Sequence, residues 1–474
     1  MDTHTARILA VDLDGTLLGT DVLWEALTEL VRRKPYLLLV APFAALRGRV
    51  HFKHWLARHV QPDFDSLPIN KPVADFVRSA KRNGQMVVLA TAAFEPWAQQ
   101  IADRLGCFDT VIGTDMVNLS GKHKLERLRS VCDGRAFDYI GDRGVDIPLW
   151  QAATDAFIVG NAARYQRRIG KAFSGTFSSP RPTLRDWYSL LRIEQWSKNL
   201  LVFAPLLLAH KLLDSAALGG AVAAALMLSI VASALYVFND LLDVPTDRQH
   251  PTKRLRPLAS GTISLPIGWL CVMLGLCIGL GGAFIALPAT AAELVALYAA
   301  ASIGYSLALK RQPIVDILVL GGLYTLRILI GGSASNTEVS AWLLGFSLVF
   351  FASLALLKRH SEVVQLQHTA DILASSRPYS VRDEQFLFTA GIATAVMAVV
   401  ILIVYVTSDR ARALYAHPDR LWFILPLLLF WILRMWRLSL HNRLRGDPLT
   451  VSLRDPASIA TGAAIIALVE FIAR

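Results

Sequence analysis

The chain has 474 residues, 54% of them hydrophobic, and a mean hydropathy of +0.43. This composition excludes a purely soluble protein and indicates an integral membrane protein with at least two domains. The net charge of +11 allows nucleic-acid binding. We expect no nucleic-acid partner, however, because much of the Lys and Arg flanks apolar stretches. The four cysteines lack metal-ligand or disulfide spacing.

Polar residues follow three predicted strands in the first 180 residues, which have the mixed composition of a soluble domain. The strands are residues 7–11, 85–90 and 137–140, and helical stretches separate them. This alternation predicts an α/β doubly wound sheet with a site at the carboxyl ends of its strands. The polar residues at or just after those ends are Asp12, Asp14, Thr91, Asp142 and Asp146.

Together with a following lysine, these residues resemble the four motifs of the haloacid dehalogenase-like (HAD) phosphatases over roughly residues 6–172. The resemblance implies that Asp12 is the nucleophile and that Asp14 is the general acid and then base. We prefer Lys124 to Lys122 as the motif lysine because K-L-E-R-L opens a helix. The alternative is a degenerate scaffold, which is disfavoured because no motif residue is missing. The implied phosphate ligands are Thr91 and Lys124, and the implied Mg²⁺ ligands are Asp12, Asp142 and Asp146.

An insert at about residues 20–80 separates the first two strands. It contains an eleven-residue apolar run, residues 36–46, with basic residues on both sides. That run is too short to span a bilayer. An interfacial membrane segment and a buried cap helix fit it equally well. The predicted domains are a HAD-like domain at 1–175, a linker at 176–184 and a membrane domain at 185–474.

The remainder predicts an all-α polytopic membrane domain of about nine spans. Counted from residues 245, 310, 358 and 434, Lys and Arg number four, two, four and five after the even spans. After the first four odd spans they number one (Lys211, near the end of the first span), none, none and three. This bias places the even loops and the HAD-like domain in the cytoplasm. We expect the membrane to be the inner membrane. The predicted spans are 199–214, 218–238, 267–287, 289–309, 314–333, 341–357, 387–406, 421–436 and 457–473.

Three acids lie at the end of the second predicted span. Asp240, Asp243 and Asp247 recur at i, i+3 and i+7, which is one helix face. They repel one another unless a cation lies between them. Three bases that suit phosphate oxygens follow, so the stretch predicts a Mg²⁺-diphosphate site at the membrane surface. The alternative is a cytoplasmic loop with positive-inside bias. The bases are Lys253, Arg254 and Arg256.

The pattern N-D-x-x-D-x-x-x-D after the second span, with about nine helices, resembles the UbiA-like intramembrane prenyltransferases over roughly residues 184–474. Members with aromatic acceptors carry a second D-x-x-x-D. Here Asp316 is followed four residues later by Leu320, so the second motif is broken. Q-W-S-K-N, D-R-Q-H-P-T-K-R-L-R-P, Y-S-L-A-L-K and L-K-R are closer to one branch, the decaprenyl-phosphate phosphoribosyltransferases.

That resemblance implies transfer of phosphoribose from phosphoribosyl pyrophosphate (PRPP) to a polyprenyl phosphate, with release of pyrophosphate. The HAD domain would then remove the 5-phosphate, and each domain would use one Mg²⁺. One alternative is a prenyltransferase with an aromatic or other acceptor, fused to an unrelated phosphatase. Another is a lipid-binding or transport scaffold, and a homo-oligomer is possible. The implied residues are catalytic Asp240 and Asp243, the metal ligands Asp240, Asp243 and Asp247, and for substrates Lys198, Asn199, Asn239, Lys253, Arg254, Arg256, Tyr305, Lys310, Arg327, Lys358 and Arg359.

Overall fold

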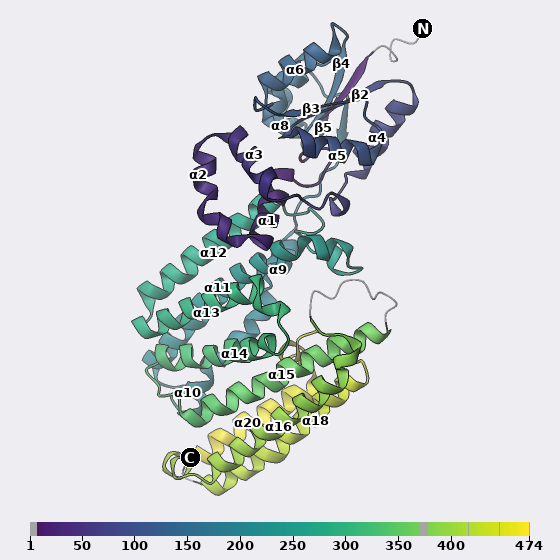
Figure 1. Ribbon diagram of the computed structural model, residues 1–474. Coiled ribbons are helices and arrows are strands. Elements are labelled where there is room, and N and C mark those ends of the chain that lie inside the picture. The colour runs from purple at the N-terminus through teal and green to yellow at the C-terminus, as the bar shows by residue number, and fades with distance from the viewer. Residues whose placement is uncertain (1–6, 369–377, 416, 445, 474) are drawn as a thin grey trace. The chain divides into compact units, whose positions relative to one another are not determined.

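The computed structural model describes residues 7–368, 378–415, 417–444 and 446–473 (Figure 1). The chain divides into two compact units. Helices α11 (Ser215–Gln249) and α12 (Leu265–Ala286) each contribute one end to the first unit and the rest to the second. The first unit contains Met1–Leu190 and Phe238–Leu270, and the second contains Leu191–Val237 and Cys271–Arg474.

The first unit contains a six-stranded parallel sheet in the order β3-β2-β1-β4-β5-β6. The first strand, β1, lies in the interior of the sheet between β2 and β4, as in other doubly wound folds. Successive residues of β1 point to opposite faces, so Leu9 and Val11 join one core while Ile8 and Ala10 join another. This confirms the predicted fold class of the N-terminal region. The strands are β1 (Ile8–Val11), β2 (Met86–Phe94), β3 (Thr110–Thr114), β4 (Phe137–Gly141), β5 (Ala156–Val159) and β6 (Gly175–Phe177).

Helices flank the sheet and build the insert after β1, here called the cap. Strand β6 pairs with β5 and therefore belongs to the sheet, although it overlaps the start of the expected linker at 176–184. The domain limits themselves stay predictions. The cap consists of α1 (Val22–Arg33), the 3-10 helix η1 (Pro35–Leu39), α2 (Ala41–Leu46) and α3 (Arg49–His59). The sheet helices are α4 (Lys71–Arg82), α5 (Glu95–Leu105), α6 (Lys122–Cys132), α7 (Ile147–Ala152) and α8 (Ala163–Ile169).

Within the described residues, seven helices are long and apolar enough to cross a membrane. The nine predicted spans are therefore not confirmed as a count. The expected first span, 199–214, is broken into the 3-10 helix η4 (Ile193–Phe203) and α10 (Ala204–Leu208). The expected last span corresponds to α20 (Pro456–Ala473), a shorter apolar helix. The seven are α11, α12, α13 (Ala289–Leu307), α14 (Val315–Ala334), α15 (Ala341–His368), α16 (Glu384–Val406) and a segment containing α18 (Ile424–Leu440).

A close backbone contact joins η4 to α14 in the second unit. A Cβ atom on Gly331 of α14 would lie 1.9 Å from the carbonyl oxygen of Val202 in η4. Only glycine permits that approach. The contact holds η4 against a membrane-spanning helix, and η4 carries two of the predicted substrate residues, Lys198 and Asn199.

Candidate active sites

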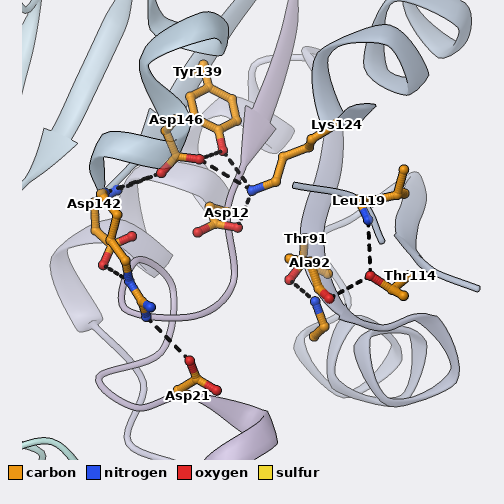
Figure 2. A network of polar contacts seen from close by, with 12 residues as sticks. Asp12, Asp21, Thr91, Ala92, Thr114, Leu119, Lys124, Tyr139, Asp142 and Asp146 are labelled. Carbon is orange, nitrogen blue, oxygen red and sulfur yellow. Dashed lines mark hydrogen bonds and ion pairs between the residues drawn. The ribbon is translucent and has the colours of Figure 1, made fainter. Parts of the chain in front are cut away.

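The HAD-like motif residues converge at the carboxyl edge of the sheet (Figure 2). Asp12 follows β1, Asp142 follows β4, and Thr91 lies within β2. Lys124 on α6 donates a hydrogen bond of 2.8 Å to Asp12 and lies 3.4 Å from Asp146. Lys122 is exposed, whereas Lys124 is buried. The geometry therefore favours Lys124 as the motif lysine.

Three carboxylates of this edge form a group that fits a divalent cation. One oxygen each of Asp12, Asp142 and Asp146 lie within 4.8 Å of one another. The Oδ1 atom of Asp142 is buried and has no hydrogen-bond partner among the described residues. A buried oxygen without a donor is costly, and carboxylate oxygens are the ligands that Mg²⁺ prefers. The donor set therefore matches the metal site expected from the sequence.

The same edge raises the pKa of several acids. Burial raises the pKa of Asp12 to about 6, against the opposing effect of the Lys124 ammonium. Burial, followed by repulsion from Asp12, raises the pKa of Asp142 to about 7. Burial and repulsion from Asp21 raise the pKa of Asp14 well above its usual range. A raised pKa of Asp14 suits the general-acid role, because the carboxyl group then keeps its proton to a higher pH.

Gly15 lets the loop after β1, which carries Asp14, lie close to the Asp142 side chain. Its φ is +77°, and a Cβ atom there would lie 2.2 Å from Oδ2 of Asp142. Both the left-handed backbone and the contact therefore require glycine. The peptide N–H of Val22 donates to Asp14 at 2.9 Å, which orients the carboxyl group from the start of the cap.

Sequence reasoning missed two residues of this site. The Tyr139 hydroxyl donates to Asp146 at 2.8 Å and accepts from Lys124 at 3.1 Å. Lys53 of the cap is buried and donates to the Ala92 carbonyl oxygen, next to Thr91, and to Asn118 at 2.6 Å. Tyr139 lies within a strand that reads as apolar core, and Lys53 lies in a basic insert, so neither stood out locally.

The acidic motif lies at the end of α11, within the first unit. Arg256 directs a single nitrogen, Nη1, to Asp240 at 3.1 Å and to Asp247 at 2.7 Å. Both carboxylates are buried. They share one cation, which in this structure is the Arg256 guanidinium. Asp243 accepts a hydrogen bond of 2.9 Å from Asn239. Lys253 and Arg254 lie nearby in sequence, in the 3-10 helix η5 (Lys253–Leu255).

Arg327 is at the centre of one polar cluster of the second unit. The residue is buried in α14, and its guanidinium donates to Asn199 at 3.0 Å and to the Tyr298 hydroxyl at 2.8 Å. It also lies over the rings of Tyr298 and Tyr324, with 5.1 Å to the second centroid. An intramembrane arginine requires such partners, because an unpaired charge in apolar surroundings is very costly.

Two predicted phosphate-binding lysines meet at a carboxylate that the sequence analysis did not single out. Lys198 donates to Asp447 at 2.8 Å, and Lys358 lies 3.5 Å from the same oxygen. The Tyr324 hydroxyl donates to that oxygen at 3.2 Å. Burial alone would raise the pKa of Asp447, but the two ammonium groups hold it well below its usual range. Two cations around one anion leave net positive charge, which suits a further anion.

A second cluster surrounds Asp316, the remnant of the broken motif. Arg359 donates to Asp316 at 2.8 Å, to Glu362 at 2.6 Å and to the Tyr305 hydroxyl at 2.9 Å. The Tyr379 hydroxyl donates to Asp316 at 2.6 Å. Asp316 is fully buried, so its charge is neutralised by protein groups. The predicted substrate residue Lys310 is also buried. The substrate roles of Arg359, Tyr305 and Lys310 stay predictions.

The UbiA prenyltransferase family matches residues 200–450, which is more than half of the chain. The haloacid dehalogenase-like hydrolase family matches residues 9–151. The chain therefore belongs to the UbiA prenyltransferase family and carries a HAD hydrolase domain. Together with the apolar helices, these matches identify an integral membrane enzyme.

Among its relatives, a Sinorhizobium fredii protein, y4nM, is 35% identical over 467 residues, which cover 96% of this chain and 89% of that protein. Decaprenyl-phosphate phosphoribosyltransferase of Mycobacterium tuberculosis is 32% identical over 284 residues, which cover 56% of this chain and 86% of that enzyme. A structure of a UbiA homolog from Archaeoglobus fulgidus bound to DMAPP and Mg²⁺ covers 60% of this chain and 98% of that chain, at 18% identity and a TM-score of 0.47. The likeness to y4nM spans both the HAD and the UbiA portions.

Proposed function

We propose that this protein transfers phosphoribose from PRPP to a polyprenyl phosphate and then removes the 5-phosphate of its lipid product. The transferase would be the UbiA portion and the phosphatase the HAD domain. We further propose that the protein lies in the inner membrane with the HAD domain in the cytoplasm, where PRPP is available. The excess of Lys and Arg in the loops after the even spans supports that orientation.

The choice of donor rests on the hydrogen bonds that occupy the Asp316 carboxylate. Prenyl-diphosphate chemistry on aromatic acceptors would use this aspartate in a second metal motif, but here Arg359 and Tyr379 bind its two oxygens. Asp316 is fully buried and both of its oxygens accept hydrogen bonds, so it is a poorer metal ligand than Asp247, on which Arg256 contacts one oxygen. The name of the Mycobacterium tuberculosis relative, decaprenyl-phosphate phosphoribosyltransferase, supplies an alternative transferred group, phosphoribose.

In the transfer step, an oxygen of the polyprenyl phosphate forms a bond to the anomeric carbon of PRPP. The bond from that carbon to the diphosphate breaks, and pyrophosphate leaves with the bonding electrons. Arg256 would move from the carboxylates of Asp240 and Asp247 to phosphate oxygens, while those carboxylates and Asp243 hold Mg²⁺. Lys198 and Lys358 would bind the lipid phosphate and orient the attacking oxygen. Magnesium, when bound, supplies positive charge beside phosphate oxygens in both domains.

In the phosphatase step, the Asp12 carboxylate would attack the phosphorus atom of the 5-phosphate and form an aspartyl-phosphate. The protonated Asp14 would give its proton to the departing ribosyl oxygen. Asp14 would then take a proton from the water that hydrolyses the aspartyl-phosphate. Lys124 is held 2.8 Å from Asp12, where its ammonium can bind the phosphate oxygens. Asp142 and Asp146 would complete the Mg²⁺ ligands with Asp12.

The donor is tested with the full-length protein in lipid nanodiscs, Mg²⁺ and PRPP labelled with radiocarbon in the ribose. We expect label in the lipid fraction only when polyprenyl phosphate is present, and none with Asp240→Ala. No labelled lipid from the wild type would reject the transfer. Label transfer from a radiolabelled prenyl diphosphate to an aromatic acceptor would favour the prenyltransferase instead. The phosphatase is tested separately: Asp12→Asn should leave the lipid product phosphorylated without slowing its formation.

A further inference from the structure

The part of the cap between α1 and α3 includes α2 (Figure 1) and is apolar and exposed. Six large apolar side chains of η1, α2 and the residue between them are exposed. All but Leu38 recur at i, i+3, i+4, i+7 and i+10, so these five share one helical face. Contiguous exposed apolar side chains on a soluble domain mark an interaction surface. The five are Tyr36, Leu39, Val40, Phe43 and Leu46.

The opposite face of this segment fixes it to the cap. Ala41 and Ala44 are buried, and Leu37 packs against the core that lies under the cap. The segment is therefore an ordered part of the domain, and only one of its faces is buried in the protein. Of the two possibilities that the sequence left open, a fully buried cap helix does not match this exposure.

The charge around the segment selects the partner. Residues 30–62 contain seven Lys and Arg residues and no Asp or Glu. Arg47 and Arg49 follow the apolar face directly, and both are exposed. An apolar face bordered by arginines fits the interfacial layer of a bilayer, where the chains bury apolar groups and the anionic headgroups meet the guanidinium groups. Tyr36 fits the same layer, because its ring is apolar and its hydroxyl is polar.

The helix that leads into the segment is bound to the ends of membrane-spanning helices within the same compact unit. Glu25 of α1 accepts two hydrogen bonds from Arg248 of α11, at 2.7 and 3.2 Å, and both side chains are buried. Trp269, near the start of α12, donates to Thr28 of α1 at 3.0 Å. The start of η1 lies only about 10 Å along the helix axis from Thr28. The segment therefore starts close to the ends of α11 and α12 that carry Arg248 and Trp269.

We propose that residues 36–46 insert into the interfacial layer of the membrane that holds the spans, with Arg47 and Arg49 on anionic lipid phosphates. The occupant of the apolar face is lipid. This contact gives the phosphatase domain a third attachment to the membrane surface, besides its covalent connection and the α1 contacts. The inference rests on the spans and the cap, and it does not depend on the proposed reaction.

The test uses the full-length chain in proteoliposomes, with single cysteines labelled by an environment-sensitive nitrobenzoxadiazole fluorophore. Leu39→Cys and Leu46→Cys are chosen because these side chains are 78% and 84% exposed. Ser130→Cys on α6 is the matched control, because it is exposed on the sheet domain. Cys271 and Cys277 are replaced by serine, since they are not buried, whereas Cys107 and Cys132 are buried.

We expect lipids with a nitroxide on the upper acyl chain to quench the label at positions 39 and 46 several-fold more than at Ser130. Raising the share of phosphatidylglycerol should increase that quenching, and Arg47→Glu with Arg49→Glu should remove the increase. Equal quenching at all three positions would overturn the proposal. A blue-shifted label that lipid does not quench, and that returns to the solvent spectrum on dilution into excess lipid, would also overturn it and assign the face to a second copy of the chain.

Discussion

Lys198 donates a hydrogen bond of 2.8 Å to Asp447 across 249 residues of sequence. Lys358 reaches the same carboxylate oxygen at 3.5 Å. One acid therefore holds together the two lysines that we propose for the lipid phosphate. Asp447 is a positioning residue in this account, since it acts through the lysines.

The first prediction concerns the loss of that acid. Asp447→Asn removes the shared counter-charge of two ammonium groups, so they no longer hold a common position. We expect KM for polyprenyl phosphate to rise on the order of tenfold, the loss of one charge-assisted contact, with KM for PRPP unchanged. Steady-state kinetics in nanodiscs check this. Asp455→Asn, which removes a neighbouring ion pair with Arg434, is the control and should change neither constant. An equal rise in both KM values would contradict the role.

The second prediction is the acid dependence of stability at the same residue. The two lysines hold the pKa of Asp447 below its unfolded value of about 3.9. A depressed pKa contributes stability above the unfolded pKa, and that stability is lost as the pH falls below it. At pH about 6, the free energy of unfolding of wild type should therefore exceed that of Asp447→Asn by about 3 kcal/mol. The gap should shrink below pH about 4. A gap that stays constant with pH would contradict the electrostatic origin.

The third prediction concerns Gly15, whose φ is +77° and which faces Asp142. Gly15→Ala should destabilise the HAD domain by about 3 kcal/mol, from backbone strain plus overpacking, and abolish phosphate release. Gly134→Ala is a matched control, because Gly134 has a φ of +76° and nothing within 4 Å of its added Cβ. That change should cost about 1 kcal/mol and keep activity. Similar losses for both variants would show that strain alone matters.

The fourth prediction separates Asp316 from the metal-binding aspartates. Asp316→Asn leaves Arg359 without its buried carboxylate, so the thermal midpoint should fall while the Mg²⁺ concentration for half-maximal transfer stays unchanged. Asp240→Asn should instead raise that concentration by about tenfold or more. A Mg²⁺ titration of both variants checks this. A rise for Asp316→Asn as large as that for Asp240→Asn would mean that Asp316 binds metal after all.

The features that could be predicted are those set by residues adjacent in the sequence. Asp12 follows a short apolar strand directly, so its place at the sheet edge could be read from neighbouring residues. Lys122 and Lys124 open the same helix, and only the fold buries one of them against Asp12. Asp447 could not be found from the sequence, because it meets Lys198 only through tertiary packing. Hydropathy also could not show that residues 199–214 are divided between η4 and α10, since it records composition and not 3-10 geometry.

The central claim is that one chain performs two consecutive reactions on one lipid. It is tested most directly with PRPP that carries radiocarbon in the ribose and radiophosphorus at the 5-phosphate, given with polyprenyl phosphate and Mg²⁺ to the full-length protein. For wild type we expect lipid that carries radiocarbon alone, with the radiophosphorus released as inorganic phosphate. For Asp12→Asn we expect both labels in the lipid in equal amounts. The same ratio of labels in the lipid of both proteins would contradict the account.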